Sequence, residues 1–181
     1  KTEQVRDQLT RIGKVELPEI APCLGSAKTQ YYRNKLEFTF ADKRWLTYEE
    51  IAAGGDIERE PALGFHIPNC FDKVLDIDTC YLQAEPSNSI RTEVKRFCIE
   101  NGYSFHNCRE HQGLMRNIII RTASTGEVMV IVVFNEDARE AITAVMEMLK
   151  EKFSQITSLF YVVNTKWNDS VGDLEHICYA G

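Results

Sequence analysis

The chain has 181 residues, of which 44% are hydrophobic and 10% aromatic, and its formal net charge is −6 at pH 7. This length and composition suit one well-packed domain and exclude an intrinsically disordered chain. No apolar run approaches the roughly 20 residues of a membrane-spanning helix and no signal peptide is recognisable, so we expect a soluble, cytoplasmic protein. The negative charge argues against nucleic-acid binding over the whole surface, but a local basic patch is compatible with it because salt screens exposed charges beyond about 8–10 Å.

The first 72 residues predict a helix followed by a β-hairpin. Apolar residues spaced by four and three indicate a short amphipathic helix over residues 2–12. The stretch YYRNKLEFTF, residues 31–40, alternates apolar and polar side chains, which is typical of a half-buried strand. A second strand is expected over residues 62–67, antiparallel to the first. The polar residues 43–61 would form a wide loop between the two strands.

Residues 73–164 predict the order β-α-β-β-α-β. The strand-like stretches are KVLDI, LMRNIIIRTA, EVMVIVVF and SLFYVVN, and the apolar stripes of residues 85–100 and 136–153 indicate two helices. This order is that of the split βαβ, or ferredoxin-like, arrangement. The predicted class is therefore α+β, an antiparallel sheet with helices packed on it, preceded by the N-terminal helix and hairpin. Residues 165–181 are expected to be a connector.

Basic residues on the predicted strands are the first candidates for a binding site. Arg33 and Lys35 occupy the polar positions of the first strand, and Arg121 lies on the strand LMRNIIIRTA. Arg116 begins an otherwise apolar row on that strand, so we expect it at the strand mouth, where its guanidinium reaches solvent or a phosphate. Together these residues would form a small cationic patch. The alternative is that they are ordinary surface cations paired with local carboxylates.

The stretch NTKWND, residues 164–169, follows the last predicted strand directly. Its Asn side chains and Lys166 can hydrogen-bond a phosphate, and Trp167 can stack on an unpaired base. The alternative is that the Asn and Asp residues simply form turns.

Three potential metal ligands occur within six residues, at His106, Cys108 and His111. Zinc normally takes four protein ligands, or three and a water, and no second ligand cluster is obvious. A small zinc enzyme is therefore a weak alternative. No nucleotide-binding glycine motif, nucleophile elbow or His-Glu-x-x-His pattern is present.

Five stretches, in order along nearly the whole chain, resemble the RNA uracil-5-methyltransferases. They are YYRNKLEFTF, LGFH, Asp76-x-x-x-Cys80, GLMRNIIIRTASTGEVMV and ITSLFYVVNTKWND. This family includes bacterial enzymes that methylate uridines of 23S ribosomal RNA and of transfer RNA. The resemblance implies that residues 1–181 form the central domain of such an enzyme.

The resemblance places the chemistry outside these residues. An iron–sulfur segment would precede them, and a Rossmann-like domain that binds S-adenosylmethionine and carries the catalytic residues would follow. We therefore expect no catalytic or cofactor-binding residue here and no activity from this part alone. In cluster-bearing members a cysteine matching Cys80 is the fourth ligand of a [4Fe–4S] centre. Its three partners would precede Lys1, so we expect no cluster in this chain and a free, partly exposed Cys80 thiol.

The role implied for the domain is to position structured RNA. Methylation at C5 requires the uridine to leave its stack, which costs a few kcal/mol, and contacts to the RNA backbone offset that cost. The candidates for these contacts are Arg33, Lys35, Arg116, Arg121, Lys166 and Trp167. The possible cluster ligand favours 23S ribosomal RNA over transfer RNA. The alternative function is a stand-alone α+β module that binds a small molecule or a protein without catalysis.

Overall fold

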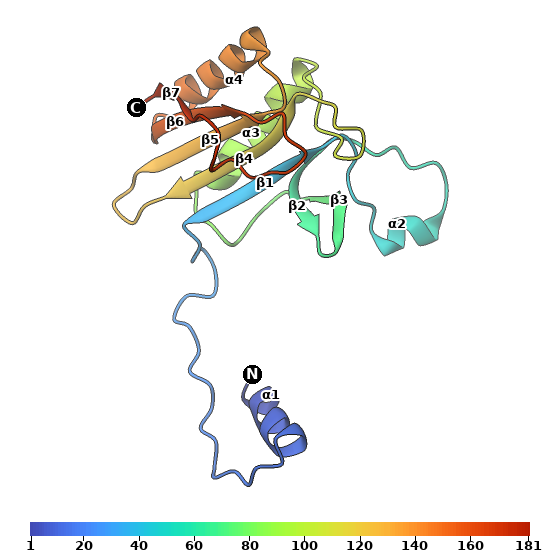
Figure 1. Ribbon diagram of the computed structural model, residues 1–181, viewed down its shortest axis with the longest axis vertical. Helices are drawn as coiled ribbons and strands as arrows, with labels where there is room; N and C mark the ends of the chain where they lie inside the picture. The colour runs from blue at the N-terminus through green and yellow to red at the C-terminus, as the bar shows by residue number, and fades with distance from the viewer.

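A computed structural model describes all 181 residues. One seven-stranded sheet forms its centre, in the order β3-β2-β1-β4-β5-β6-β7 (Figure 1). The strands are β1 (Lys35–Ala41), β2 (Ala62–Ile67), β3 (Cys70–Asp76), β4 (Met115–Thr122), β5 (Val128–Phe134), β6 (Ile156–Val163) and β7 (Ile177–Ala180). The helices are α1 (Thr2–Asp7), the π-helical turn η1 (Gln8–Ile12), α2 (Tyr48–Ala53), α3 (Ser87–Glu100) and α4 (Arg139–Lys152).

The predicted α+β class and the element order are confirmed, but the strand order is not that of a split βαβ unit. All strand pairs are antiparallel except β5 and β6, which α4 joins as adjacent parallel strands. A split unit would insert a strand between them. The connection through α3 carries the chain from β3, at the sheet edge, past β2 and β1 to β4. The predicted β1–β2 hairpin thus lies between β3 and β4, inside the sheet that residues 73–164 were expected to form.

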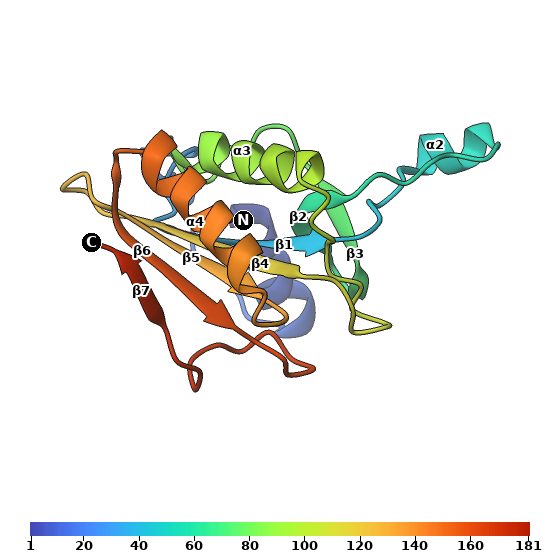
Figure 2. The ribbon, with the colours of Figure 1, turned by 90° about the horizontal axis from the view of Figure 1, so that it is seen from above.

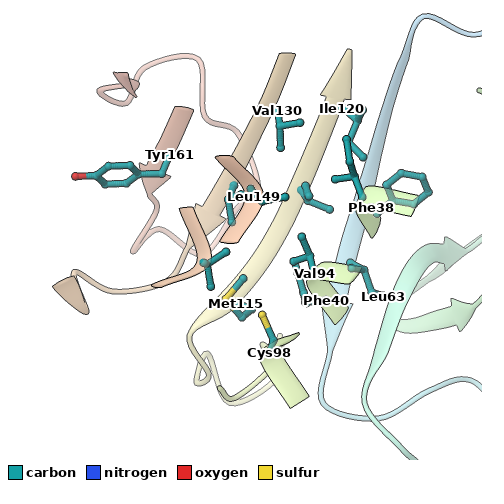
Figure 3. Packing of buried hydrophobic residues seen from close by; sticks show 14 of the residues in the cluster. Phe38, Phe40, Leu63, Val94, Cys98, Met115, Ile120, Val130, Leu149 and Tyr161 are labelled. Carbon is teal, nitrogen blue, oxygen red and sulfur yellow. The ribbon is translucent and has the colours of Figure 1, made fainter. Parts of the chain in front are cut away.

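Helices α3 and α4 cover one face of the sheet, and the main core lies between them and the strands (Figure 2). The apolar positions of β1, at Leu36, Phe38 and Phe40, all point into this core, as period-two alternation predicts. Val94 of α3 and Leu149 of α4 are fully buried in the same core (Figure 3). Burial of these side chains is the dominant favourable term in folding.

The opposite face of the sheet, here called the open face, has a thinner cover. Ile119, Ile131 and Val162 form a second apolar cluster there, and Val171 and Leu174 pack on it. The segment between β6 and β7 therefore crosses this face, and β7 then pairs with β6. Residues 177–180, expected to belong to a connector, are instead the last strand of the sheet.

The N-terminal part differs from the expectation in extent. The helix over residues 2–12 forms as α1 and η1, but it lies apart from the sheet on an extended connector, and none of its residues is buried (Figure 1). The first strand begins at Lys35, so residues 31–34 precede it. The loop over residues 43–61 contains the short helix α2, which a capping box of Thr47 and Glu50 begins. None of the helices combines the length and the apolar composition of a membrane-spanning segment.

Candidate nucleic-acid interface

The basic residues predicted from the sequence separate into two groups at opposite ends of the open face. Lys35 at the start of β1 lies directly opposite Arg121 near the end of β4. Arg33 precedes β1 and is exposed, as are Lys35 and Arg121. Arg116, Lys166 and Trp167 lie at the other end, about 16 Å away along β4 by strand rise. The single cationic patch expected from the sequence is therefore divided between the two ends of this face.

Lys35 and Arg121 form an unusual cross-strand pair. Like charges that face each other across a sheet destabilise it, so this pair does not contribute to the stability of the fold. Arg33 and Arg121 form no ion pair, and Lys35 has only a long contact of 3.8 Å between Nζ and the Glu37 carboxylate. Three cations at this end are thus available to an anionic ligand.

Arg116 does not reach solvent as expected. A β-bulge lies at this residue, since Met115 pairs with Phe134 and Asn117 with Val133, and Arg116 has no partner. The bulge places Arg116 beside Asn117 on the open face, while Met115 and Ile118 stay in the main core. The predicted position of Arg116 at the start of the apolar row of this strand is therefore wrong.

The guanidinium of Arg116 holds the loop that follows β6. Only 2% of the side chain is exposed. Nη1 donates to the carbonyl oxygens of Asn164 and Lys166 at 2.7 and 2.6 Å, and Nη2 donates to the Asp169 carboxylate at 2.8 Å and the Asn168 carbonyl at 3.3 Å. Four acceptors from one loop fix its path. A guanidinium this engaged positions the loop and has little capacity left for a phosphate.

The loop of residues 164–169 also closes on itself. The buried Asn164 accepts from the backbone N–H of Lys166 at 3.0 Å and donates to the Asn168 carbonyl at 2.9 Å. The Nζ of Lys166 bonds Asp173 at 2.6 Å. Asn164 and Asn168 therefore form turn-stabilising hydrogen bonds, as the alternative interpretation expected. The turn directs one side chain of the loop outward.

That side chain is Trp167, which is 76% exposed. One face of its indole stacks on the His111 ring, with centroids 4.3 Å apart and planes 19° apart. His111 in turn meets the His106 ring edge-on at 5.4 Å, and its Nε2 lies 3.0 Å from the Thr165 carbonyl oxygen. The imidazole thus supports the indole from one side and leaves the other side open.

A cavity of about 680 Å³ lies beside the indole on the open face. It is lined by β1, β2, β3, the bulged end of β4 and the loops before β4 and after β6, and its residues include Thr39, His66, Phe71, His106, Asn117 and Trp167. This volume falls within the range of about 300–1,000 Å³ of small-ligand pockets.

Burial keeps two titratable groups of the cavity uncharged. Desolvation, with the nearby Arg116 guanidinium next, lowers the pKa of His106 below its ordinary value. Desolvation, with the Asp72 carboxylate next, raises the pKa of the Cys108 thiol. Neutral imidazole and protonated thiol are therefore the forms at neutral pH.

No three His, Cys, Asp or Glu side chains are grouped so that they could hold a metal ion. His106, Cys108 and His111 thus do not form a zinc site, and the rings of His106 and His111 pack against each other instead. Cys80 is 5% exposed and belongs to the main core, so the expected partial exposure of its thiol is wrong. An iron–sulfur cluster needs several cysteine thiolates together, and these residues provide no such set.

Several residues of this end of the sheet were missed by sequence reasoning. Thr39 and Asn117 are cross-strand partners joined by a 3.2 Å hydrogen bond from Nδ2 to Oγ1. Phe71 is 66% exposed, with the Arg109 guanidinium 5.6 Å from its ring centroid. Phe71 is followed by Asp72 and Lys73 and belongs to no recognisable sequence motif. The one sequence feature that could have indicated a binding residue was its place as an aromatic residue at the start of an edge strand.

Sequence similarity to known proteins identifies the family of the chain. It is 50% identical over 184 residues to an RNA methyltransferase of Bacteroides thetaiotaomicron and 52% identical over 186 residues to one of Porphyromonas gingivalis, with 100% of the chain covered in both. The chain belongs to the RNA methyltransferase family. The predicted membership among RNA methyltransferases is thereby confirmed, and the uracil-5 reaction stays a prediction. The chain spans 40% of the length of these two RNA methyltransferases.

A more distant RNA methyltransferase, from Chlorobaculum tepidum, is 33% identical over 186 residues, covering 98% of the chain and 38% of the relative. Among solved structures, the Pyrococcus abyssi tRNA (uracil-54, C5)-methyltransferase in complex with S-adenosyl-L-homocysteine superposes with a TM-score of 0.61. The two sequences are 24% identical, and the match covers 99% of the present chain and 37% of the Pyrococcus abyssi chain. This likeness shows that the two share a fold. No protein-family model matches the chain.

Proposed function

We propose that this chain is the RNA-positioning part of a cytoplasmic, S-adenosylmethionine-dependent RNA uracil-5-methyltransferase. The RNA methyltransferase relatives support an RNA substrate, and the fold shared with a tRNA (uracil-54, C5)-methyltransferase supports the uracil-5 reaction. Residues 1–181 would form one central domain of the protein, with residues 1–72, 73–164 and 165–181 as its successive parts.

The observation that carries this proposal is the pair of cations at Lys35 and Arg121. They face each other across β1 and β4, and Arg121 has no carboxylate partner. A phosphate placed between two such cations removes their mutual repulsion and forms charge-assisted hydrogen bonds. Arg33, just before β1, adds a third cation beside this pair for a neighbouring phosphate.

The second end of the open face adds the aromatic contact. Trp167 offers one open indole face, and Arg116 and Lys166 hold its loop in place. We therefore assign RNA contact to Arg33, Lys35, Arg121 and Trp167, and a positioning role to Arg116 and Lys166.

Methyl transfer itself we assign to a part of the protein beyond these residues. S-adenosylmethionine supplies the methyl group there, and the present chain contributes the contacts that hold the RNA. We propose no catalytic residue within it and no activity for it alone.

For the substrate we favour 23S ribosomal RNA, because Cys80 matches the fourth cluster ligand of cluster-bearing family members. Transfer RNA is the second candidate, favoured by the substrate in the name of the Pyrococcus abyssi enzyme. Competition between unmodified transcripts of both RNAs for binding to the chain discriminates the two.

The test is the salt dependence of RNA binding, measured by fluorescence anisotropy with a labelled, structured RNA. We expect affinity to fall linearly on a logarithmic salt scale. Lys35→Gln and Arg121→Gln should each weaken binding and reduce the slope by about 1, as loss of one phosphate contact does.

Lys150→Gln is the matched control, since Lys150 is an exposed cation of α4 on the helix-covered side. It should leave both affinity and slope unchanged. A flat salt response of the unaltered chain, or equal effects of all three substitutions, would contradict the proposal.

A further inference from the structure

The cavity at the second end of the open face has no surplus charge. Its four ionised lining side chains form two ion pairs, Asp72 with Arg109 at 2.6 Å and Arg116 with Asp169 at 2.8 Å. Desolvation also favours the neutral forms of His106 and Cys108. A phosphate would therefore find no free cation inside, and an uncharged group is the better match.

Its walls suit a flat group. Trp167 and Phe71 line the cavity from two different segments, and both rings are mostly exposed, by 76% and 66%. Nucleobases stack on exposed aromatic rings regardless of sequence. Trp167 is already fixed by His111 on one face, so little freedom is lost when its other face is covered.

Its floor offers hydrogen bonds in a buried setting. Asn117 is 3% exposed, and its bond to Thr39 uses one of the two amide N–H donors. His106 is 6% exposed and also lines the cavity, and its Nδ1, like the Nε of Arg116, has no hydrogen-bond partner. A polar group that enters the floor would supply the hydrogen bonds that buried polar atoms normally make.

We propose that this cavity receives one unpaired nucleobase of the RNA, stacked on Trp167 with its edge toward Asn117 and His106. This inference rests on the proposed function and adds the ligand of the second site. The thiol of Cys108 is protonated at neutral pH, so the cavity has no activated nucleophile. The base is held rather than modified, while the Lys35 and Arg121 end binds the backbone.

The test uses Trp167 as its own reporter. The chain has two tryptophans, so Trp45→Phe leaves the indole of Trp167 as the single source of tryptophan fluorescence. Titration with single-stranded oligoadenylate and oligouridylate should quench this fluorescence. An abasic ribose-phosphate oligomer of equal length should bind more weakly and should not quench it.

Affinity measurements separate stacking from folding. Trp167→Leu should weaken binding of the base-bearing oligomers about 5- to 150-fold, the value of one stacked base, and leave abasic binding unchanged. Trp167→Phe should restore most of the loss. Because Trp167 is exposed, both variants should keep the circular dichroism spectrum and unfolding midpoint of the parent chain.

Two results would overturn the inference in distinguishable ways. If Trp167→Leu binds RNA as tightly as the parent while binding still falls with salt, the base site is refuted and the proposed function stands. If the parent chain shows no salt-dependent RNA binding at all, the proposed function fails and the base site fails with it.

Discussion

The carboxylate of Asp169 lies 2.8 Å from the guanidinium of Arg116, and the two partners differ sharply in burial: 51% of the aspartate side chain is exposed and 2% of the arginine. The arginine also serves three backbone carbonyls of the same loop. The two residues are therefore not equivalent halves of an ion pair. Arg116 determines whether the loop is held, and Asp169 adds one of four contacts.

This difference predicts unequal effects on stability. Arg116→Met should lower the free energy of unfolding by at least about 2 kcal/mol, because one buried and two part-buried carbonyl acceptors lose their donor. Asp169→Asn should cost about 1 kcal/mol, because the exposed Asn side chain can still accept one hydrogen bond and the three carbonyl contacts remain. Urea unfolding followed by circular dichroism measures both. Equal losses for the two variants would show that the carbonyl contacts carry no weight.

The cross-strand pair predicts a gain in stability at the expense of binding. Arg121→Glu places a carboxylate opposite Lys35 and should raise the free energy of unfolding by about 0.2–1 kcal/mol. The same change should weaken RNA binding more than Arg121→Gln does, because it adds a repelling charge. Urea unfolding and anisotropy on one protein preparation test both effects. A destabilised Arg121→Glu chain would argue that Lys35 is already neutralised by Glu37.

Burial predicts an order of thiol reactivity. Cys23 and Cys178 are exposed, whereas Cys80 and Cys98 are buried, and burial raises the pKa of Cys98 to about 12. Iodoacetamide followed by mass spectrometry should modify the first two in the native chain and the second two after addition of denaturant. Rapid modification of native Cys80 would place its thiol at the surface, contrary to its position in the main core.

The cap of α2 predicts a local response to acid. Hydrogen bonding by Arg44, followed by the Thr47 backbone N–H, lowers the pKa of Glu50 from 4.5 to about 2. A carboxylate with a lowered pKa contributes its full stabilisation above about pH 4.5 and loses it as pH falls toward 2. The protection factors of the amides in residues 48–53, taken relative to the intrinsic exchange rate at each pH, should therefore fall over that interval, and Glu50→Gln should abolish this fall. Unchanged protection factors between pH 4.5 and 2 would show that the capping box does not hold the helix.

Patterns local in the sequence predicted local structure well. The alternation at Leu36, Phe38 and Phe40 located β1, and the apolar stripes located α3 and α4 to within a few residues. The helix α2 could also have been predicted, because Thr47 and Glu50 fit the capping-box spacing. The strand β7 could not have been predicted, since residues 177–180 are too few to show a period-two pattern.

The candidate site depends on contacts that no local pattern records. Trp167 stacks on His111, 56 positions earlier, and residues 105–112 reach it only because of the strand order. Arg116 was assigned to the wrong face because period-two counting assumes a regular strand, and a bulge shifts the count by one. The proximity of His106, Cys108 and His111 in sequence suggested chelation, but the chain turns there and the rings pack against one another.

Because of the bulge at Arg116, the contacts of β4 with the loop after β6 and its packing in the main core depend on different residues. Because the additional residue shares the open face with Asn117, the side chains that meet the helices keep their order on both sides of it. Loss of that one residue would restore a regular ladder with Met115 and Ile118 still inward, yet it would release the loop that presents Trp167. Insertion or deletion at this single position can therefore change the loop that presents Trp167 while the packing on the helix-covered face of the sheet stays the same.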